Sequence, residues 1–215
     1  MLENYYKENE IEVGIDESGA GPMMGNLYIG AVILPNECPF EECKEYWDML
    51  NDSKKLSEKK RNILFDFIQE IAIDYSIVKV SPRDIDIDNI WYSRVNGFHT
   101  AIDELNIRPT HIIVDGNAFK PYYDIEGNTI PHVCIEKGDS KYKSIAAASI
   151  LAKVSHDRDI IKLHEEYPEY NWIKNKGYGT KEHIEAIKKY GITKYHRKTY
   201  GICKNWQELP QTFIN

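Results

Sequence analysis

Two adjacent acidic residues, Asp16 and Glu17, stand at the end of a short apolar stretch over residues 11–15. The stretch alternates and is rich in β-branched residues, which is typical of a β-strand. A turn rich in glycine, residues 18–22, follows the two acids directly. Adjacent side chains of a strand point to opposite faces, so both carboxylates approach one point only at the strand's end or at a bulge. Because Asp and Glu also begin ordinary turns, this pair alone leaves a purely structural interpretation open.

Two further aspartates occupy similar positions later in the chain. Asp115 ends an apolar run that begins at residue 111, and Asp139 follows a second run over residues 130–136. Acids at the strand ends of one sheet can meet at one edge, where like charges repel unless a cation lies among them. An all-oxygen donor set favours Mg²⁺ or Mn²⁺. Carboxylates around two such ions are typical of phosphodiester hydrolysis, in which one ion activates water and the other stabilises the leaving oxygen.

The charge of the chain is unevenly distributed. Its 215 residues, which favour one domain with room for a helical extension, carry a formal net charge of -7. That sum argues weakly against a nucleic-acid partner, but local clusters matter more than the total. Many basic residues fall in two clusters, one of Lys54, Lys55, Lys59, Lys60 and Arg61, and one of Lys174, Lys176, Lys181, Lys188, Lys189, Lys194, Arg197 and Lys198.

The cysteines and the apolar runs indicate a cellular compartment. The four cysteines show no zinc-binding spacing, which predicts free thiols and a reducing environment; they are Cys38, Cys43, Cys134 and Cys203. The first residues lack the basic and apolar regions of a signal peptide, and no apolar run approaches the length of a membrane span. We therefore expect a cytoplasmic monomer without disulfides.

Strands and helices are expected to alternate along most of the chain. The patterns predict strands at 11–16, 27–34, 75–80, 111–116 and 130–136, and helices at 58–72, from near 82 to 105, at 142–166 and at 181–190. Small residues at 146–148 predict close packing of the third helix, and residues 51–56 and 117–129 are expected to be loops. The tail is expected to be helical near Trp206. This order predicts an α/β sheet with helices on both faces.

Eight motifs occur in order along the chain, and together they carry a family resemblance. They are residues 14–22, 52–58, 85–90, 114–117, 137–140, 144–154, 176–180 and 195–197. On these motifs the chain resembles the ribonuclease HII family, the type 2 ribonucleases H, over residues 11–201. The resemblance implies an RNase H-like fold with a five-stranded mixed sheet flanked by helices. It also implies a catalytic domain over 1–166 and a C-terminal helical extension over 167–215.

The resemblance further implies an activity. The family cleaves RNA in RNA–DNA hybrids and cuts 5′ of ribonucleotides embedded in duplex DNA, leaving 3′-hydroxyl and 5′-phosphate ends. Its metal-binding acids fall on Asp16, Glu17, Asp115 and Asp139, the same four that the strand ends indicate. Two divalent ions, Mg²⁺ or Mn²⁺, are therefore the expected cofactors.

Several substrate-binding positions also follow from the resemblance. The turn Gly19-Ala20-Gly21 matches the family turn that reads the 2′-hydroxyl, the one group that separates RNA from DNA at a single site. The family has arginine where Ala20 stands, so a weaker phosphate contact is expected, although the glycines still allow close backbone approach. Tyr178 matches a tyrosine that stacks on the sugar beside the junction; without the family it would read as an ordinary loop residue.

Two other segments are assigned to the substrate backbone. Ser53, Lys54 and Lys55 match a phosphate-contacting loop. Lysines at a helix start oppose the helix dipole and suit phosphates, although a solvated surface run is the simpler interpretation. His196 and Arg197 lie in another family motif and are expected to contact the substrate backbone.

Three alternatives stay open. Ala20 favours a hybrid-binding protein with weakened catalysis or altered junction preference, whereas the four retained acids favour an enzyme. Ribonuclease HIII usually carries an extra N-terminal domain, and the ten residues before the first strand leave no room for one. A Mg²⁺-dependent phosphatase would use similar acids, but the basic residues at 53–61 favour a long polyanion.

Overall fold

A five-stranded mixed sheet forms the centre of the molecule in the computed structural model, which describes residues 1–206. Its strands run in the order β3-β2-β1-β4-β7. Their bounds are β1 Glu12–Ser18, β2 Leu27–Ile33, β3 Asp74–Val80, β4 His111–Asp115 and β7 His132–Ile135. β2 is antiparallel to β1 and β3, whereas β4 is parallel to β1 and β7. The expected mixed sheet is confirmed.

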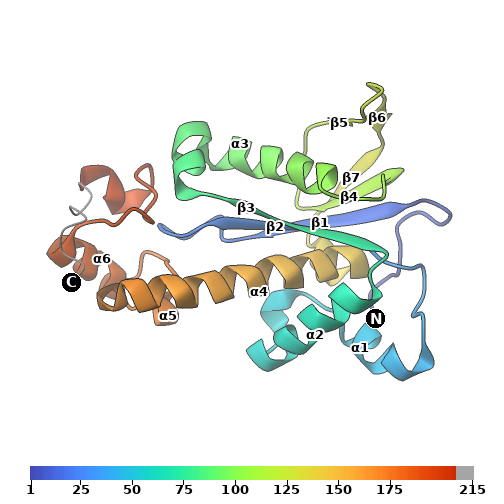
Figure 1. Cartoon of the computed structure of the whole chain (residues 1–215), viewed down its shortest axis with the longest axis horizontal. Helices are drawn as coiled ribbons and strands as arrows, with labels where there is room; N and C mark the ends of the chain where they lie inside the picture. Colours follow the sequence, from blue (N-terminus) through green and yellow to red (C-terminus); the bar gives the residue numbers. More distant parts are fainter. Residues whose placement is uncertain (207–215) are drawn as a thin grey trace.

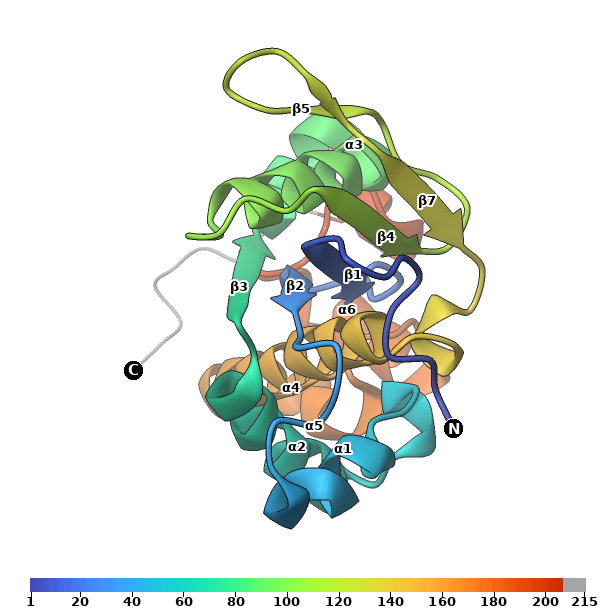
Figure 2. The same ribbon diagram turned by 90° about the vertical axis from the view of Figure 1, so that its right-hand side faces the viewer.

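Helices cover both faces of this sheet, as predicted (Figure 1). The helix α3, Pro82–Asp103, lies on one face, and α4, Lys143–Glu166, lies on the other. Figure 2 shows α2, Glu58–Ile71, and α1, Lys44–Met49, beyond α4 on its side away from the sheet. A short 3-10 helix, η1 Glu41–Cys43, leads into α1. The layers are therefore helix, sheet, helix and helix.

Small residues bring α4 very close to the two central strands. A Cβ atom added to Gly14 of β1 would lie 2.3 Å from the backbone carbon of Ser144. One added to Gly30 of β2 would lie 2.4 Å from the backbone oxygen of Ala148. The predicted close packing is confirmed, and it rests on glycine in the strands as much as on alanine in the helix.

The first two long helices begin at side-chain caps. Ser57 precedes α2, and its hydroxyl accepts a hydrogen bond from the N–H of Lys60. Ser81 and Asp84 form a reciprocal capping box at the start of α3. α3 is interrupted at Asn89, whose φ of 62° lies outside the helical region.

Three expectations about irregular segments are wrong in detail. Residues 117–129 are not simply a loop, because β5 Tyr122–Tyr123 pairs with β6 Thr129–Ile130. The predicted fifth strand is divided at Pro131, which has no N–H to donate to a neighbouring strand. The loop before α2 contains the 3-10 helix η2 Ser53–Lys55. The helix expected near Trp206 is present, as the 3-10 helix η5 Gly201–Asn205. Elements of two or three residues are too short to show a period in the sequence.

The C-terminal region packs on the connection between β1 and β2. It contains the 3-10 helix η4 Pro168–Tyr170, α5 Trp172–Asn175 and the predicted helix α6 Lys181–Tyr190. Tyr170 and Trp172 form a buried cluster with Met24 of that connection and Ile160 of α4. The division into 1–166 and 167–215 stays a prediction, and residues 207–215 lie outside the described residues. Among residues 1–206, no helix is both long and apolar enough to cross a membrane.

Replacing Gly30 by alanine is expected to destabilise the fold strongly. The added Cβ meets backbone of α4, which has no flexible end to move aside, so a loss of roughly 2–4 kcal/mol in unfolding free energy is expected. Gly127→Ala is the control, because a Cβ there meets nothing within 4 Å and only the positive φ of 83° opposes it. Urea unfolding measures both variants, and equal losses would contradict the close packing of α4.

Candidate active site

The acidic pair lies where β1 extends beyond its parallel neighbour. β1 pairs with β2 through Ser18, whereas its pairing with β4 ends at Ile15 opposite Val114. Asp115, the next residue of β4, therefore lies beside the unpaired edge of Asp16 and Glu17. Burial raises the pKa of both, and the negative charge of Asp115 adds to the rise. The two acids lie inside β1, in the part that β4 does not pair, and no bulge brings their side chains to one face.

Asp16 is buried on the α4 side of the sheet. Burial raises its pKa well above the ordinary value, and the charges of Glu17 and Asp115 raise it further. The hydroxyl of Ser149 on α4 and the N–H of Glu17, which donates to Asp16 Oδ1 at 2.7 Å, partly offset this rise. The carboxylate is thus held in place although its charge is costly.

Glu17 faces α3, as the alternation of a strand requires. Arg94 of α3 forms an ion pair with it, with 3.2 Å between Arg94 Nε and Glu17 Oε2. Burial raises the pKa of Glu17, the nearby Arg94 and Lys54 lower it, and Asp115 raises it. Asp16 and Glu17 therefore point to opposite faces, yet both lie within the field of Asp115.

Asp139 reaches the same edge from the 3-10 helix η3, Gly138–Ser140, which leads into α4. The N–H of Gly138 donates to Asp115 Oδ1 at 2.7 Å and ties the two segments together. Burial, followed by the charges of Asp52 and Asp115, raises the pKa of Asp139 to about 6. The charge of Asp115 thus acts on each of the other three predicted acids.

Asp52 is a fifth acid that the sequence analysis did not select as a site residue. Its carboxylate lies next to Asp139 and raises the pKa of that group. It precedes η2, not a strand, so the strand-end argument does not find it; its place at the start of the 52–58 motif was the available signal. A pocket of about 370 Å³ lies among these segments. Its lining residues are Asp52, Lys54, Lys55, Asp115, Lys137, Asp139 and Ser140.

The donor set fits a hard divalent cation, although the carboxylates are not drawn together at ligand distance. Within residues 1–206, no group of three or more Asp, Glu, His or Cys side chains is close enough to hold an ion as it stands. Glu17 and Asp115 are instead held by Arg94 and by the Gly138 N–H. The raised pKa values of Asp16, Glu17 and Asp139 reflect burial first and neighbouring negative charge second, in an oxygen-only site. A divalent cation relieves such crowding.

The glycine-rich turn lies next to Tyr178. Gly19 has a φ of 94°, and a Cβ there would lie 2.6 Å from His156 Cδ2, so this position requires glycine. Gly21 is exposed, and a Cβ there would lie 3.2 Å from Tyr178 Cε1. The Tyr178 side chain is 52% exposed, so its ring is open to a ligand beside the turn.

Three residues expected to touch the substrate have buried side chains, and their contact with the substrate stays a prediction. Ser53 is 2% exposed, and its hydroxyl lies 3.0 Å from that of Ser149. His196 and Arg197 are 1% and 0% exposed. Sequence motifs do not distinguish a residue that contacts a ligand from one that holds the contacting residue. Lys54 and Lys55 remain exposed, and Lys55 Nζ donates to Ser140 Oγ at 2.9 Å.

Buried histidines connect the extension to the backbone of Tyr178. The N–H of Thr193 donates to His196 Nδ1 at 2.9 Å, which leaves the proton of a neutral imidazole on Nε2. That nitrogen lies 3.1 Å from His183 Nε2, which also accepts from Trp172 Nε1. His183 therefore carries its proton on Nδ1 and donates to the carbonyl of Tyr178 at 3.0 Å. Both histidines are held neutral in this chain of hydrogen bonds.

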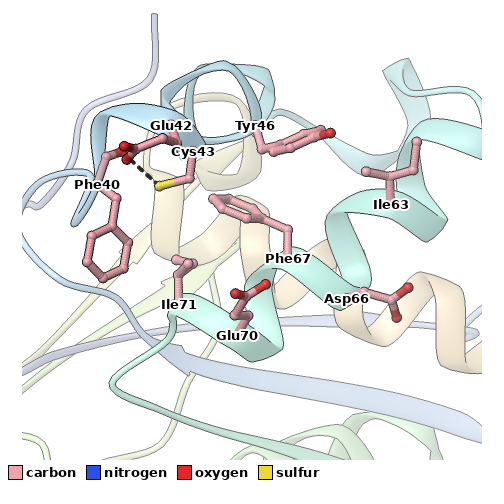
Figure 3. Close-up of a pocket in the computed structure, with 9 residues that line it drawn as sticks. All are labelled: Phe40, Glu42, Cys43, Tyr46, Ile63, Asp66, Phe67, Glu70 and Ile71. Atoms are coloured by element: carbon pink, nitrogen blue, oxygen red, sulfur yellow. Dashed lines mark hydrogen bonds between the residues drawn. The ribbon is translucent and has the colours of Figure 1, made fainter.

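A second pocket, of about 540 Å³, has a different character (Figure 3). It lies against α1 and α2, and none of the site acids lines it. Phe40, Phe67 and Ile71 give it apolar walls, and Asp66 and Glu70 stand among them. Carboxylates line this pocket and no Lys or Arg side chain of residues 1–206 does, which does not suit a polyanion. The acidic edge of the sheet is therefore the candidate active site.

A mixed five-stranded sheet between helices, with acids from neighbouring strand ends at one edge, defines an α/β protein of the RNase H-like class. The family model described as Ribonuclease HII matches residues 13–203. The chain therefore belongs to the ribonuclease HII family and is a ribonuclease H enzyme.

Individual relatives agree with this assignment. The Ribonuclease HII of Christiangramia forsetii is 50% identical over 199 residues, which cover 93% of this chain and 94% of the relative. The crystal structure of the ribonuclease H2 from Pyrococcus horikoshii OT3 is 28% identical with a TM-score of 0.74, over 90% of this chain and 95% of that one. Bst-RNase HIII in complex with Mn²⁺ is 17% identical with a TM-score of 0.64, over 90% and 68% of the two chains, and shares the fold.

Replacing Asp139 by asparagine is expected to stabilise the metal-free protein. Its raised pKa, about 6, means that the ionised form is disfavoured in the fold. Removing the charge should raise the melting temperature near pH 7.5 by roughly 2–4 °C. Mg²⁺ should then stabilise the variant less than the native protein, because one donor has lost its charge.

Thermal unfolding with and without Mg²⁺ measures both effects. Asp66→Asn is the matched control, because Asp66 is an exposed acid outside the site and should show neither effect. A lower melting temperature for metal-free Asp139→Asn would contradict the crowding of negative charge at the site.

Acidification is expected to destabilise the fold through His196. Burial and the neighbouring His183 lower its pKa to about 3, against about 6.5 in an unfolded chain. The unfolded chain therefore binds more protons, and the stability present above about pH 6.5 falls as the pH drops towards about 3. This group alone accounts for a loss of about 1.4 kcal/mol near pH 5.5.

Urea unfolding near pH 7.5 and pH 5.5 tests the effect. His196→Gln keeps a polar side chain that does not titrate, so its stability should depend less on pH, by about 1.4 kcal/mol over this interval. An identical pH dependence in the two proteins would show that His196 is not the titrating group.

Proposed function

We propose that this protein hydrolyses the RNA strand of RNA–DNA hybrids and also cuts 5′ of ribonucleotides embedded in duplex DNA, leaving 3′-hydroxyl and 5′-phosphate ends. The observation that carries the proposal is the convergence of Asp16, Glu17, Asp115 and Asp139 on one edge of the sheet, where three of them have raised pKa values. Membership of the ribonuclease HII family supports the same activity.

Divalent ions are the proposed cofactors. Two Mg²⁺ or Mn²⁺ ions held by the four acids would supply an activated water and charge stabilisation for the leaving oxygen. The Mn²⁺ complex of Bst-RNase HIII, which shares the fold, supports a divalent metal. Arg94 holds Glu17, and the Gly138 N–H holds Asp115, so the carboxylates are oriented by the chain itself.

The remaining site residues suit a nucleic-acid backbone. Lys54 and Lys55 are exposed beside the acids, where their charges attract phosphates. The exposed ring of Tyr178 offers an apolar face to a sugar, next to the glycine-rich turn whose backbone amides suit a 2′-hydroxyl. The proposed duplex therefore runs from the lysines across the acids to the turn.

We also propose how the chain is divided into parts and where in the cell the protein acts. Residues 1–166 form the catalytic domain and residues 167–215 a C-terminal extension, and Arg197 of this extension holds the turn. The protein acts as a cytoplasmic monomer, which the free thiols of Cys38, Cys43, Cys134 and Cys203 support, because free thiols suit a reducing compartment.

A hybrid-binding protein with weakened catalysis is the second candidate. Ala20 favours it, because the turn has no guanidinium of its own to contact a phosphate. The four acids favour the enzyme, since a protein that only binds gains nothing from their mutual repulsion.

Cleavage of two labelled duplexes in Mg²⁺ and then in Mn²⁺ distinguishes these candidates. One duplex has a single ribonucleotide in DNA, and the other is a continuous RNA–DNA hybrid. We expect both to be cut, the first 5′ of the ribonucleotide, and we expect Asp115→Asn to lower kcat at least about a hundredfold. Cleavage of the hybrid alone would remove junction cutting from the proposal, and cleavage of neither by the folded protein would favour the binding-only candidate.

A further inference from the structure

Arg197 is a fully buried cation that is bound by backbone carbonyls. Its side chain is 0% exposed, and no carboxylate within residues 1–206 forms an ion pair with it. Nη1 donates to the carbonyl of Ala20 at 3.0 Å, and Nη2 donates to that of Gly19 at 2.6 Å. Nε and Nη2 both donate to the carbonyl of Gly25, at 3.1 Å and 2.9 Å. A buried charge persists only where such partners compensate for lost water, so this arrangement is a specific one.

These bonds determine which way the turn presents its N–H groups. In a planar trans peptide the C=O and the following N–H point in opposite directions, and no peptide bond of the chain is cis. Because the carbonyls of Gly19 and Ala20 point at Arg197, the N–H groups of Ala20 and Gly21 point away from it. Neither N–H donates to a protein acceptor among residues 1–206, and Gly21 is exposed. Two successive N–H donors are therefore directed away from Arg197 and have no protein acceptor among residues 1–206.

Other contacts hold Arg197 in place between the turn and the rest of the C-terminal region. Its own N–H donates to the carbonyl of Met23 at 2.8 Å. Its guanidinium lies 5.0 Å from the ring centre of Tyr200, whose hydroxyl also donates to the carbonyl of Ala20. On the next residues, the N–H groups of Lys198 and Thr199 donate to Asp86 of α3. Contacts with Met23, Tyr200 and Asp86 thus fix the segment that carries the guanidinium.

We propose that Arg197 is a positioning residue for ribonucleotide recognition: it turns the carbonyls of Gly19 and Ala20 inward, so that the N–H groups of Ala20 and Gly21 face the substrate. The inference rests on the proposed function, since it names how the turn of that same site reads its ligand. The acceptor for these donors is the 2′-hydroxyl oxygen of a ribonucleotide next to Tyr178. The backbone can serve as the reader although position 20 is alanine.

The first test compares Arg197→Lys with two hydroxyl deletions. A lysine keeps the charge but cannot reach three carbonyls at once. Tyr200→Phe removes only the second donor to the Ala20 carbonyl. Tyr170→Phe is the matched control, because it removes a hydrogen bond to Gly191 within the same C-terminal region and leaves the turn alone. The quantity measured is the ratio of kcat/KM on the single-ribonucleotide duplex to kcat/KM on the continuous hybrid.

We expect that ratio to fall about tenfold in Arg197→Lys and about twofold to threefold in Tyr200→Phe, with the loss mainly in KM. The hybrid offers a 2′-hydroxyl at every position, so it tolerates a misplaced turn better. Tyr170→Phe should lower the melting temperature without changing the ratio. An unchanged ratio in Arg197→Lys, at a melting temperature similar to that of the control, would overturn the proposal.

The second test does not depend on catalysis. Amide signals of Ala20 and Gly21 are followed by NMR in EDTA while either the single-ribonucleotide duplex or the same duplex in all-DNA form is added. In the native protein both signals should shift more with the ribonucleotide, which separates the 2′-hydroxyl from the phosphate as the acceptor. In Arg197→Lys the difference should vanish and exchange of both amides with solvent should change at least about fivefold.

Together, the two tests distinguish a failure of the proposed function from a failure of the role proposed for Arg197. If the native protein cuts neither duplex, the proposed function fails, but ribonucleotide-dependent shifts that disappear in Arg197→Lys still support the positioning role. If the native protein cuts both duplexes while the Ala20 and Gly21 signals are the same in the two proteins, the function stands and the role of Arg197 is overturned.

Discussion

The close contact of α4 with the central strands is the constraint on which the site depends. Gly14 and Gly30 leave no room for a side chain between β1, β2 and the helix backbone. The same helix begins just after Asp139 and places Ser149 next to Asp16. Near its other end, Ile160 packs in the buried cluster of Met24, Tyr170 and Trp172. One rigid element therefore sets the distance between the acids and the region that supports the turn. A shift of α4 would move both ends of the site together.

The negative charge at this edge of the sheet destabilises the folded protein. Asp16, Glu17 and Asp139 all have raised pKa values, with burial as the first cause and neighbouring carboxylates among the others. Arg94 and the N–H of Gly138 compensate for part of this cost, each by holding one carboxylate. Such partly compensated crowding is typical of functional sites, where a bound cation completes the balance.

Sequence periodicity and turn chemistry were sufficient for the five main strands and the long helices, because each spans several repeats of its period. The acids at strand ends could be selected because the chain order of strand, acid and glycine is local. Asp52 could not be selected in this way, since its proximity to Asp139 depends on how two loops meet in space. The burial of Ser53 and Arg197 could not be predicted from the sequence either. Serine and arginine are usually exposed, and only the fold shows which residues cover them.

The burial of Arg197 changes how the alanine at position 20 is understood. The Ala20 side chain is partly buried against the hydrophobic core, and a side chain at this position does not determine the direction of the peptide groups. That direction follows from the carbonyls, which are held from beneath by a residue more than 170 positions later in the chain. Loss of a surface guanidinium and retention of a buried one are therefore separate events with separate effects. In the function proposed for this site, the first weakens attraction to phosphate, whereas the second preserves the geometry for discrimination of a 2′-hydroxyl.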